Sequence, residues 1–206
     1  MAILVIRHGE TAGNASRIVQ TPDTPLSERG LLQAERLGRR FAGAGLGGIL
    51  ASDLTRATMT AECLAAACGA PVTFDSLLHE RNFGDIRGTA YADLAEDLFA
   101  ADFVPPGGES WEIFDQRVGR AWEAIRAAAA ATEGDLAVVT HGLVCASLVR
   151  NHLSLASLSP PEPAPLRFGN TAVTIVDAAP PWTVRRLNCV AHLADLPDPD
   201  PESGAV

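Results

Sequence analysis

The chain has 206 residues, of which 47% are hydrophobic and 20% are charged, and its formal net charge is −9. This length and composition predict a single globular domain with a proper core, and the acidic balance argues against nucleic-acid binding, which needs a basic surface. All 16 cationic residues are arginine, which excludes lysine Schiff-base chemistry and the phosphate-binding loop of the G-x-x-x-x-G-K-[ST] type.

The apolar runs are short, and none approaches the roughly 20 residues that span a bilayer. No basic leader precedes the first apolar stretch, so we expect no membrane association and a cytoplasmic location. The four cysteines lack C-x-x-C spacing. We therefore favour buried, reduced thiols over a disulfide or a metal site.

The first half of the chain predicts two strand–helix pairs. Ser27 and Asp53 are the expected helix N-caps, and Gly69 the expected stop of the second helix. The predicted elements are a strand at 3–6, a helix from 28 to about 42, a strand at 48–51 and a helix from 54 to 68.

The second half continues the alternation after an irregular stretch. Its predicted elements are a strand at 72–74, a stretch at 76–108 with one small helix at 91–100, a helix from Ser110 to about Thr132, a strand at 136–140, a helix at 142–152, and strands at 172–176 and 183–187. A proline-rich connector occupies 159–165. Such alternation predicts a layered α/β domain with a mainly parallel sheet over residues 1–192, followed by a disordered tail at 193–206.

Two predicted strands end in the same way, with His8-Gly9 and with His141-Gly142. Because parallel strands end at the same edge of a sheet, we expect the two histidines to converge. A lone strand-end histidine is more often structural, but the repeated pair favours a ligand site, where the glycines would let backbone N–H groups approach closely. No carboxylate stands nearby at ligand spacing, so we expect no metal.

Two arginines accompany these histidines. Arg7 precedes His8, and Arg56 falls in the first turn of the helix that follows the second strand. A cation near a helix N-terminus is mildly unfavourable unless an anion offsets it. Together with the imidazoles these groups form a set of donors suited to a tetrahedral dianion such as phosphate.

The chain resembles the histidine phosphatase superfamily, the phosphoglycerate mutase-like enzymes. The blocks that carry the resemblance occur in family order: RHGET with Asn14, the R-x-x-x-x-x-D-x-P-L-S-x-x-G pattern at 17–30, S-x-L-x-R-A-x-x-T-A at 52–61, LHERNFG at 78–84, PPGGES at 105–110, and THG at 140–142. The resemblance implies a three-layer α/β/α sandwich in which residues 76–108 cap the substrate.

The resemblance also implies catalytic roles for five residues. His8 would be the nucleophile that carries the phosphoryl group, and Arg7 and Arg56 would keep it neutral by lowering its pKa. His141 and the two arginines would hold the phosphoryl oxygens. Glu80 would protonate the leaving group and then activate water.

Further substrate-binding residues follow from the same comparison. Asn14 and the backbone at Gly142 and Leu143 would add neutral donors. Many relatives have glycine where this chain has Gln20, so Gln20 or Thr21 would reach the substrate instead, unless both are simply exposed. The outer pocket would involve Arg81, Arg87 and Trp111, each of which is as readily explained by packing or surface exposure.

Hydrolysis is favoured over mutase activity. Related mutases have a tyrosine three residues after the acid, a lysine eleven residues after it and an arginine pair further on, where this chain has Phe83, Tyr91 and the glycines near 107. We therefore expect a phosphatase that acts on a small phosphorylated molecule and needs no cofactor. A mutase and a non-catalytic phosphoester-binding module are the alternatives. The natural substrate and the oligomeric state are left open.

Overall fold

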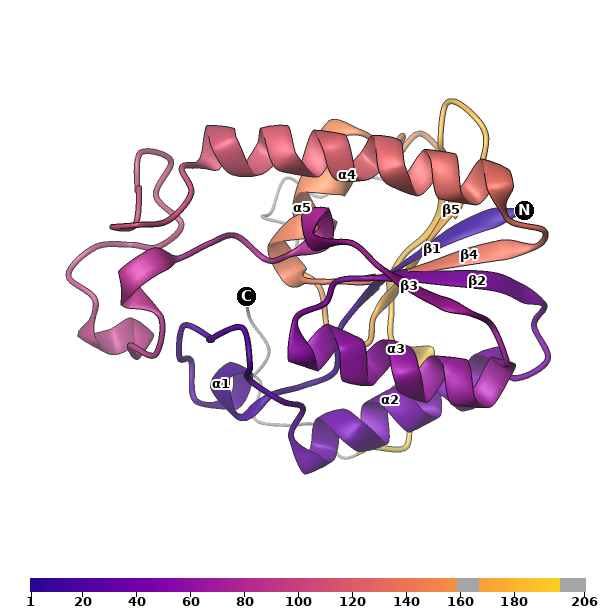
Figure 1. Cartoon of the computed structure of the whole chain (residues 1–206), viewed down its shortest axis with the longest axis horizontal. Helices are drawn as coiled ribbons and strands as arrows, with labels where there is room; N and C mark the ends of the chain where they lie inside the picture. The colour runs from indigo at the N-terminus through magenta and orange to yellow at the C-terminus, as the bar shows by residue number, and fades with distance from the viewer. Residues whose placement is uncertain (159–166, 197–206) are drawn as a thin grey trace.

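The centre of the molecule is one six-stranded sheet with the order β3-β2-β4-β1-β5-β6 (Figure 1). The computed structural model describes residues 1–158 and 167–196. β1, β4, β2 and β3 run parallel to one another. β5 pairs antiparallel with β1, and β6 pairs antiparallel with β5. The prediction of a mainly parallel sheet is therefore confirmed. The strands span Ala2–Arg7 (β1), Leu46–Ala51 (β2), Val72–Phe74 (β3), Asp135–Thr140 (β4), Val173–Asp177 (β5) and Val184–Cys189 (β6).

Helices cover both faces of the sheet. The helices α2 (Glu28–Phe41) and α3 (Thr55–Cys68) lie on one face, and α4 (Trp111–Ala131) and α5 (Gly142–Asn151) lie on the other (Figure 1). Successive residues of a strand point to opposite faces. Ile3 and Val5 of β1 accordingly pack in the core beneath α4 and α5, while Leu4 and Ile6 pack against α2 and α3. The predicted three-layer sandwich is confirmed.

The caps of the helices agree with the sequence in part. Ser27 caps α2 as predicted, and Gly69 ends α3 in the left-handed conformation with φ 74°. The cap predicted for α3 is wrong. Leu54 is its N-cap, without a side-chain bond, and the Asp53 carboxylate pairs with His79 instead. Asp53 thereby joins the start of α3 to the loop that follows β3.

The cap segment, residues 76–108, extends beyond the carboxyl ends of the parallel strands (magenta to pink in Figure 1). It contains three single-turn 3₁₀ helices, at Ser76–Leu78, Gly84–Ile86 and Tyr91–Asp93. The small helix predicted over 91–100 is present only as the 3₁₀ turn at its start, because Leu94 adopts an extended conformation and the chain turns away. This turn brings Leu98 and Phe103 into a small core with Val19 and Phe83.

Outside the cap segment, two short elements have no counterpart in the sequence prediction: α1 (Ala12–Ala15) and a 3₁₀ helix at Ala191–Leu193. The structure describes residues 193–196 of the predicted tail, which begin at the last residue of this 3₁₀ helix. The connector at 159–165 and residues 197–206 lie outside the described residues.

The cysteines are free thiols, but only Cys145 is buried, and the other three are half-buried, so the prediction of buried thiols holds for one of four. Within residues 1–158 and 167–196, no helix has both the length and the apolar character needed to cross a bilayer.

Candidate active site

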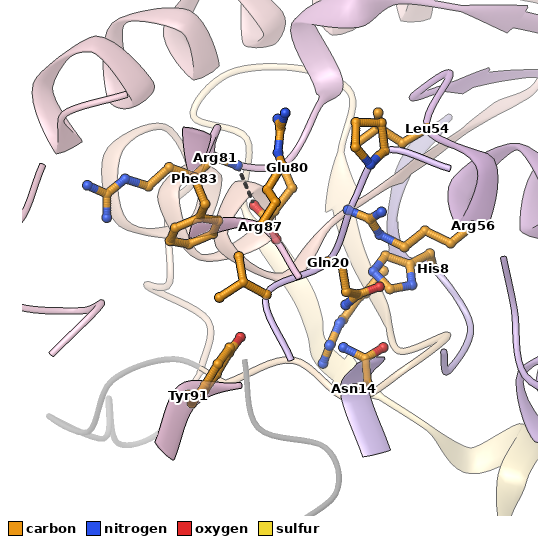
Figure 2. A pocket seen from close by; sticks show the side chains of 13 residues that line it. His8, Asn14, Gln20, Leu54, Arg56, Glu80, Arg81, Phe83, Arg87 and Tyr91 are labelled. Atoms are coloured by element: carbon orange, nitrogen blue, oxygen red, sulfur yellow. Dashed lines mark hydrogen bonds between the residues drawn. The ribbon is translucent and has the colours of Figure 1, made fainter. Parts of the chain in front are cut away.

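A pocket that is open to solvent lies at the carboxyl ends of the parallel strands (Figure 2). His8 follows β1 and His141 follows β4, and their ring centroids lie 5.2 Å apart. The expected convergence of the two histidines is therefore correct. The pocket is lined by Arg7, His8, Asn14, Val19, Gln20, Pro22, Leu54, Arg56, Glu80, Arg81, Phe83, Arg87 and Tyr91.

The imidazole of His8 has a defined tautomer. Its Nδ1 lies 2.6 Å from the carbonyl oxygen of Gly9, which can only accept a hydrogen bond. Nδ1 therefore carries the proton, and the lone pair of the ring is on Nε2. Burial lowers the pKa of His8 well below its usual value, and the charges of Arg56 and Arg7 lower it further. Burial therefore lowers the pKa of His8 more than the two arginines expected from the sequence do.

The backbone of His8 is held from two sides. Its N–H donates to the carbonyl of Thr140 in β4, and its carbonyl accepts from the Asn170 side chain and the Thr171 N–H. Gly9 serves a purpose other than the predicted one. Its N–H donates to the Thr60 hydroxyl, so it does not face a ligand, and a Cβ there would lie 2.6 Å from the carbonyl oxygen of Gly30. The glycine is needed for this close approach of the loop to α2.

Arg7 and Arg56 are both buried and both line the pocket. One terminal nitrogen of Arg7 donates to the carbonyl of Phe168 at 2.5 Å, and one of Arg56 donates to the carbonyl of Thr21 at 3.1 Å. Burial lowers the pKa of Arg56 to about 10. It remains charged at neutral pH, so the pocket keeps two fixed cations beside His8.

His141 is fully buried, and its two ring nitrogens differ. Nε2 lies 2.8 Å from the hydroxyl of Ser52, which itself accepts from the Leu54 N–H. When the Ser52 hydroxyl donates to Nε2, the proton of the neutral ring is on Nδ1. Nδ1 has no hydrogen-bond partner among the residues that the structure describes. A buried donor of this kind suits a bound oxygen.

Glu80 lies in the pocket with both carboxylate oxygens already engaged. One oxygen accepts from the Arg81 N–H at 3.0 Å, and the other accepts from the N–H of Leu143 in α5 at 3.2 Å. Burial nevertheless raises the pKa of Glu80, although the two hydrogen bonds and the nearby charges of Arg56 and Arg7 oppose the shift. A raised pKa favours the protonated form that a general acid requires.

The backbone around Glu80 is fixed by one arginine of α4. The Arg117 guanidinium donates to the carbonyls of Leu77 and His79 at 2.8 Å and of Glu80 at 3.2 Å. It also forms a two-point ion pair with Glu109, at 2.8 and 2.7 Å. We call this group the Arg117 clamp. It places the acid relative to the sheet through side chains rather than through strand pairing.

Of the side chains predicted as neutral donors to the substrate, two line the pocket and one does not. Asn14 and Gln20 line the pocket, whereas Thr21 does not; its hydroxyl bonds Thr24 and its carbonyl accepts from Arg56. The Asn14 Oδ1 accepts from Thr11 N–H and Asn170, and the Gln20 Oε1 accepts from the Thr11 hydroxyl. Both amide oxygens are occupied, so the NH₂ groups of both side chains are left for the pocket.

Of the three residues predicted for the outer pocket, Arg81 and Arg87 line the pocket and Trp111 does not. The Arg81 guanidinium donates to the carbonyls of Glu109, Leu98 and Phe103 and stacks 3.9 Å from the ring centre of Trp111. Trp111 is not among the pocket residues and packs beneath this arginine. Arg81 therefore holds the cap segment together, and binding substrate would require it to exchange a carbonyl partner.

The backbone donors of α5 have different partners. The Leu143 N–H, predicted to bind substrate, is taken by Glu80. Gly142 is buried at the first position of the helix. Leu143 therefore ties the acid to the helix that follows His141 instead of binding substrate, and the backbone role of Gly142 stays a prediction.

The pocket at the end of the parallel sheet, lined by His8, Arg7 and Arg56 with His141 buried beside His8, suits a tetrahedral anion such as a phosphoryl group. The chain belongs to the histidine phosphatase superfamily (branch 1), whose family model matches residues 3–190. The resemblance found in the sequence is thus confirmed.

Relatives within this superfamily have been named for two activities. A Salmonella paratyphi B protein named as a probable phosphoglycerate mutase, GpmB, is 32% identical over an alignment of 210 positions that covers 94% of this chain and 95% of the relative. The alpha-ribazole phosphatase of Shigella flexneri superposes with a TM-score of 0.76 at 26% identity, over 92% of this chain and 97% of that one. A mycobacterial glucosyl-3-phosphoglycerate phosphatase, solved with VO3, has a TM-score of 0.74 at 27% identity, over 91% and 99% of the two chains.

Sequence reasoning missed several residues that support the site. Ser52 fixes His141, Arg117 and Glu109 fix the loop of Glu80, and Asn170 links His8 to Asn14. Ser52 stands directly after β2 within one of the motif blocks, which was an available signal. Arg117 gave none, since an arginine on a long helix looks like any solvated charge.

Proposed function

We propose that the protein is a phosphatase that hydrolyses a phosphomonoester through a phosphohistidine on His8. The observation that carries the proposal is the Nδ1 contact of His8 to Gly9, because it leaves an unprotonated Nε2 in a pocket with two buried arginines. The raised pKa of Glu80 supplies the acid that departure of an alkoxide requires.

In the first half-reaction, the Nε2 lone pair attacks phosphorus and the bond from phosphorus to the ester oxygen breaks. Glu80 gives its proton to that oxygen, and the alcohol leaves. Arg7, Arg56 and Nδ1–H of His141 stabilise the charge on the three transferred oxygens, and the amide groups of Asn14 and Gln20 add neutral donors.

In the second half-reaction, the Glu80 carboxylate takes a proton from water and the hydroxide attacks phosphorus. The phosphorus–nitrogen bond breaks and its electron pair returns to Nε2 of His8. Inorganic phosphate leaves, and both residues are back in their starting forms. Arginine charges provide what a metal ion would otherwise supply, so activity is expected to persist in EDTA.

The decisive experiment is to trap the intermediate. Wild-type protein quenched during turnover of a ³²P-labelled monoester should hold an acid-labile, base-stable label on His8. The His8→Ala variant should hold none and should lose p-nitrophenyl phosphate hydrolysis. His152→Ala is the matched control, since that histidine stacks on Trp122 outside the pocket. A fully active His8→Ala variant would rule the proposal out.

Mutase activity is the second candidate, because the Salmonella relative carries that name. The pocket offers Phe83 and Tyr91 where the related mutases have tyrosine and lysine, which favours hydrolysis. Incubation with 3-phosphoglycerate and 2,3-bisphosphoglycerate should release inorganic phosphate without forming 2-phosphoglycerate. Because a nucleophile and an acid are both present, a purely binding role is the least favoured reading.

A further inference from the structure

The outer wall of the pocket is mainly apolar. Five of its lining residues are aliphatic or aromatic: Val19, Pro22, Leu54, Phe83 and Tyr91. Val19 and Phe83 belong to the small core of the cap segment, so this wall is set by packing and not by exposed side chains alone. Figure 2 shows the Tyr91 hydroxyl directed toward the pocket. An apolar surface formed by Val19, Leu54 and Phe83 favours contact with an apolar or aromatic group.

One cation in this wall differs from all the others. Arg7, Arg56 and Arg81 are buried and bonded to carbonyls, whereas Arg87 is exposed. Its guanidinium forms no hydrogen bond or ion pair with any residue in 1–158 or 167–196. Burial is the main cause of the lowered pKa of Arg56, and the positive charge of Arg87 contributes to it.

The charges of the pocket leave Arg87 without a counterpart. A phosphoryl dianion is balanced by Arg7 and Arg56, and Arg81 lies near the carboxylates of Glu109 and Asp115. Both histidines are neutral, and Glu80 is protonated when it acts as the acid. The formal charge of the whole chain is −9, so the exposed Arg87 is a local feature and not part of a basic surface. Arg87 is therefore available to pair with a third negative charge, one on the substrate.

We infer that the substrate is a phosphomonoester whose leaving group is an apolar, preferably aromatic body with a second anionic group, a carboxylate or another phosphate, that pairs with Arg87. This inference rests on the proposed phosphatase function and adds the class of leaving group. The apolar body packs on Val19, Leu54 and Phe83, and Arg87 selects for the second anion.

The first test compares matched aryl phosphates: 4-carboxyphenyl phosphate, its neutral analogue 4-carbamoylphenyl phosphate, and the bisphosphate of hydroquinone. Wild-type kcat/KM should be about tenfold higher for an anionic substrate than for the carbamoyl analogue. This preference should shrink as salt is added, because Arg87 is exposed. The anion that gives the larger increase in kcat/KM, carboxylate or phosphate, identifies the group that pairs with Arg87.

The variant Arg87→Gln should reduce the ratio of kcat/KM between an anionic substrate and the carbamoyl substrate from about tenfold to less than twofold. Arg120→Gln is the matched control, since Arg120 is an exposed arginine of α4 that does not line the pocket. The inference is wrong if the wild type shows no preference for either anion, or if Arg87→Gln keeps the preference.

Binding measurements keep the inference testable without turnover. In calorimetry, 4-carboxybenzylphosphonate should bind about tenfold more tightly than benzylphosphonate, and more tightly than 3-phosphonopropionate, which has both anions but no ring. Equal affinities for the two benzyl compounds would reject the role of Arg87, and equal affinity for the ringless compound would reject the apolar wall. If no ester is hydrolysed, the proposed phosphatase function fails, but these affinities still decide the inference.

Discussion

The two ends of the pocket are held in place by different means. At the phosphoryl end, Arg7 is the last residue of β1, and His8 and His141 come directly after β1 and β4. The backbone of His8 is hydrogen-bonded to β4 and to the residues before β5. At the leaving-group end, Glu80 and the cap segment have almost no regular structure and depend on Arg117 and Arg81, whose guanidinium groups bind six carbonyls between them. Strand pairing thus fixes the nucleophile, while two arginines fix the acid.

This contrast can be tested first at the phosphoryl end. The variant Arg56→Gln should lower kcat/KM by about 10²- to 10³-fold, because one buried cation that stabilises the transferred oxygens is lost. The loss should be similar for good and poor leaving groups, since the charge on those oxygens develops with either. Steady-state kinetics with p-nitrophenyl and alkyl phosphates check this. A loss confined to alkyl esters would instead assign Arg56 to the leaving-group end.

The acid should behave in the opposite way. Glu80→Gln is expected to slow hydrolysis of alkyl phosphates about 10²-fold or more, and p-nitrophenyl phosphate much less, because nitrophenolate leaves without a proton. Inhibition by phosphate should change little. An equal loss with every leaving group, or no loss with any, would contradict the assignment.

The dependence of kcat/KM on pH also tests the role of Glu80. The raised pKa of Glu80 means that kcat/KM for alkyl phosphates falls as pH rises through that pKa, where the free enzyme loses its acid. The lowered pKa of His8 keeps the nucleophile neutral, and therefore active, below the usual range of histidine. In Glu80→Gln the alkaline decrease should disappear. Its persistence in the variant would show that another group titrates there.

A smaller effect is expected from the Arg117 clamp. Arg117→Met should reduce kcat for alkyl phosphates about tenfold and should hardly change KM, because the side chain positions Glu80 and does not touch substrate. Arg117→Lys should recover part of the rate, and Arg120→Met on the same helix should have no effect. The melting temperature separates this loss from unfolding. Equal losses with p-nitrophenyl and alkyl esters would indicate a general structural role.

The smallest effect should come from Gln20. Gln20→Gly removes an amide that the Thr11 hydroxyl orients toward the pocket, so kcat/KM should fall only about threefold with any leaving group. Thr21→Ala is the control, since its hydroxyl bonds Thr24 and not the pocket. A larger loss in the control than in Gln20→Gly would reverse the assignment.

The phosphoryl end was the part most open to prediction from sequence. A short β-branched run that stops at Arg7 and His8, repeated before His141, identifies strand ends, and strand ends of a parallel sheet share one edge. The cap segment was not predictable in the same way. Residues 91–100 have helical composition, yet the chain leaves the helix after one turn, because Leu98 and Phe103 are drawn into the small core and their carbonyls receive the Arg81 guanidinium. Such non-local contacts leave no periodic pattern.

The base of the cap segment has a consequence for how the protein can diverge. Asn82 and Glu109 are joined by reciprocal backbone and side-chain hydrogen bonds, and the Asp85 N–H donates to the carbonyl of Pro106. The segment is thus closed at its root, just beyond Glu80. Residues 87–104 lie within this closed segment and supply Arg87 and Tyr91 to the pocket, so changes there should alter which alcohol is accepted, provided that the carbonyls of Leu98 and Phe103 keep their bonds to Arg81.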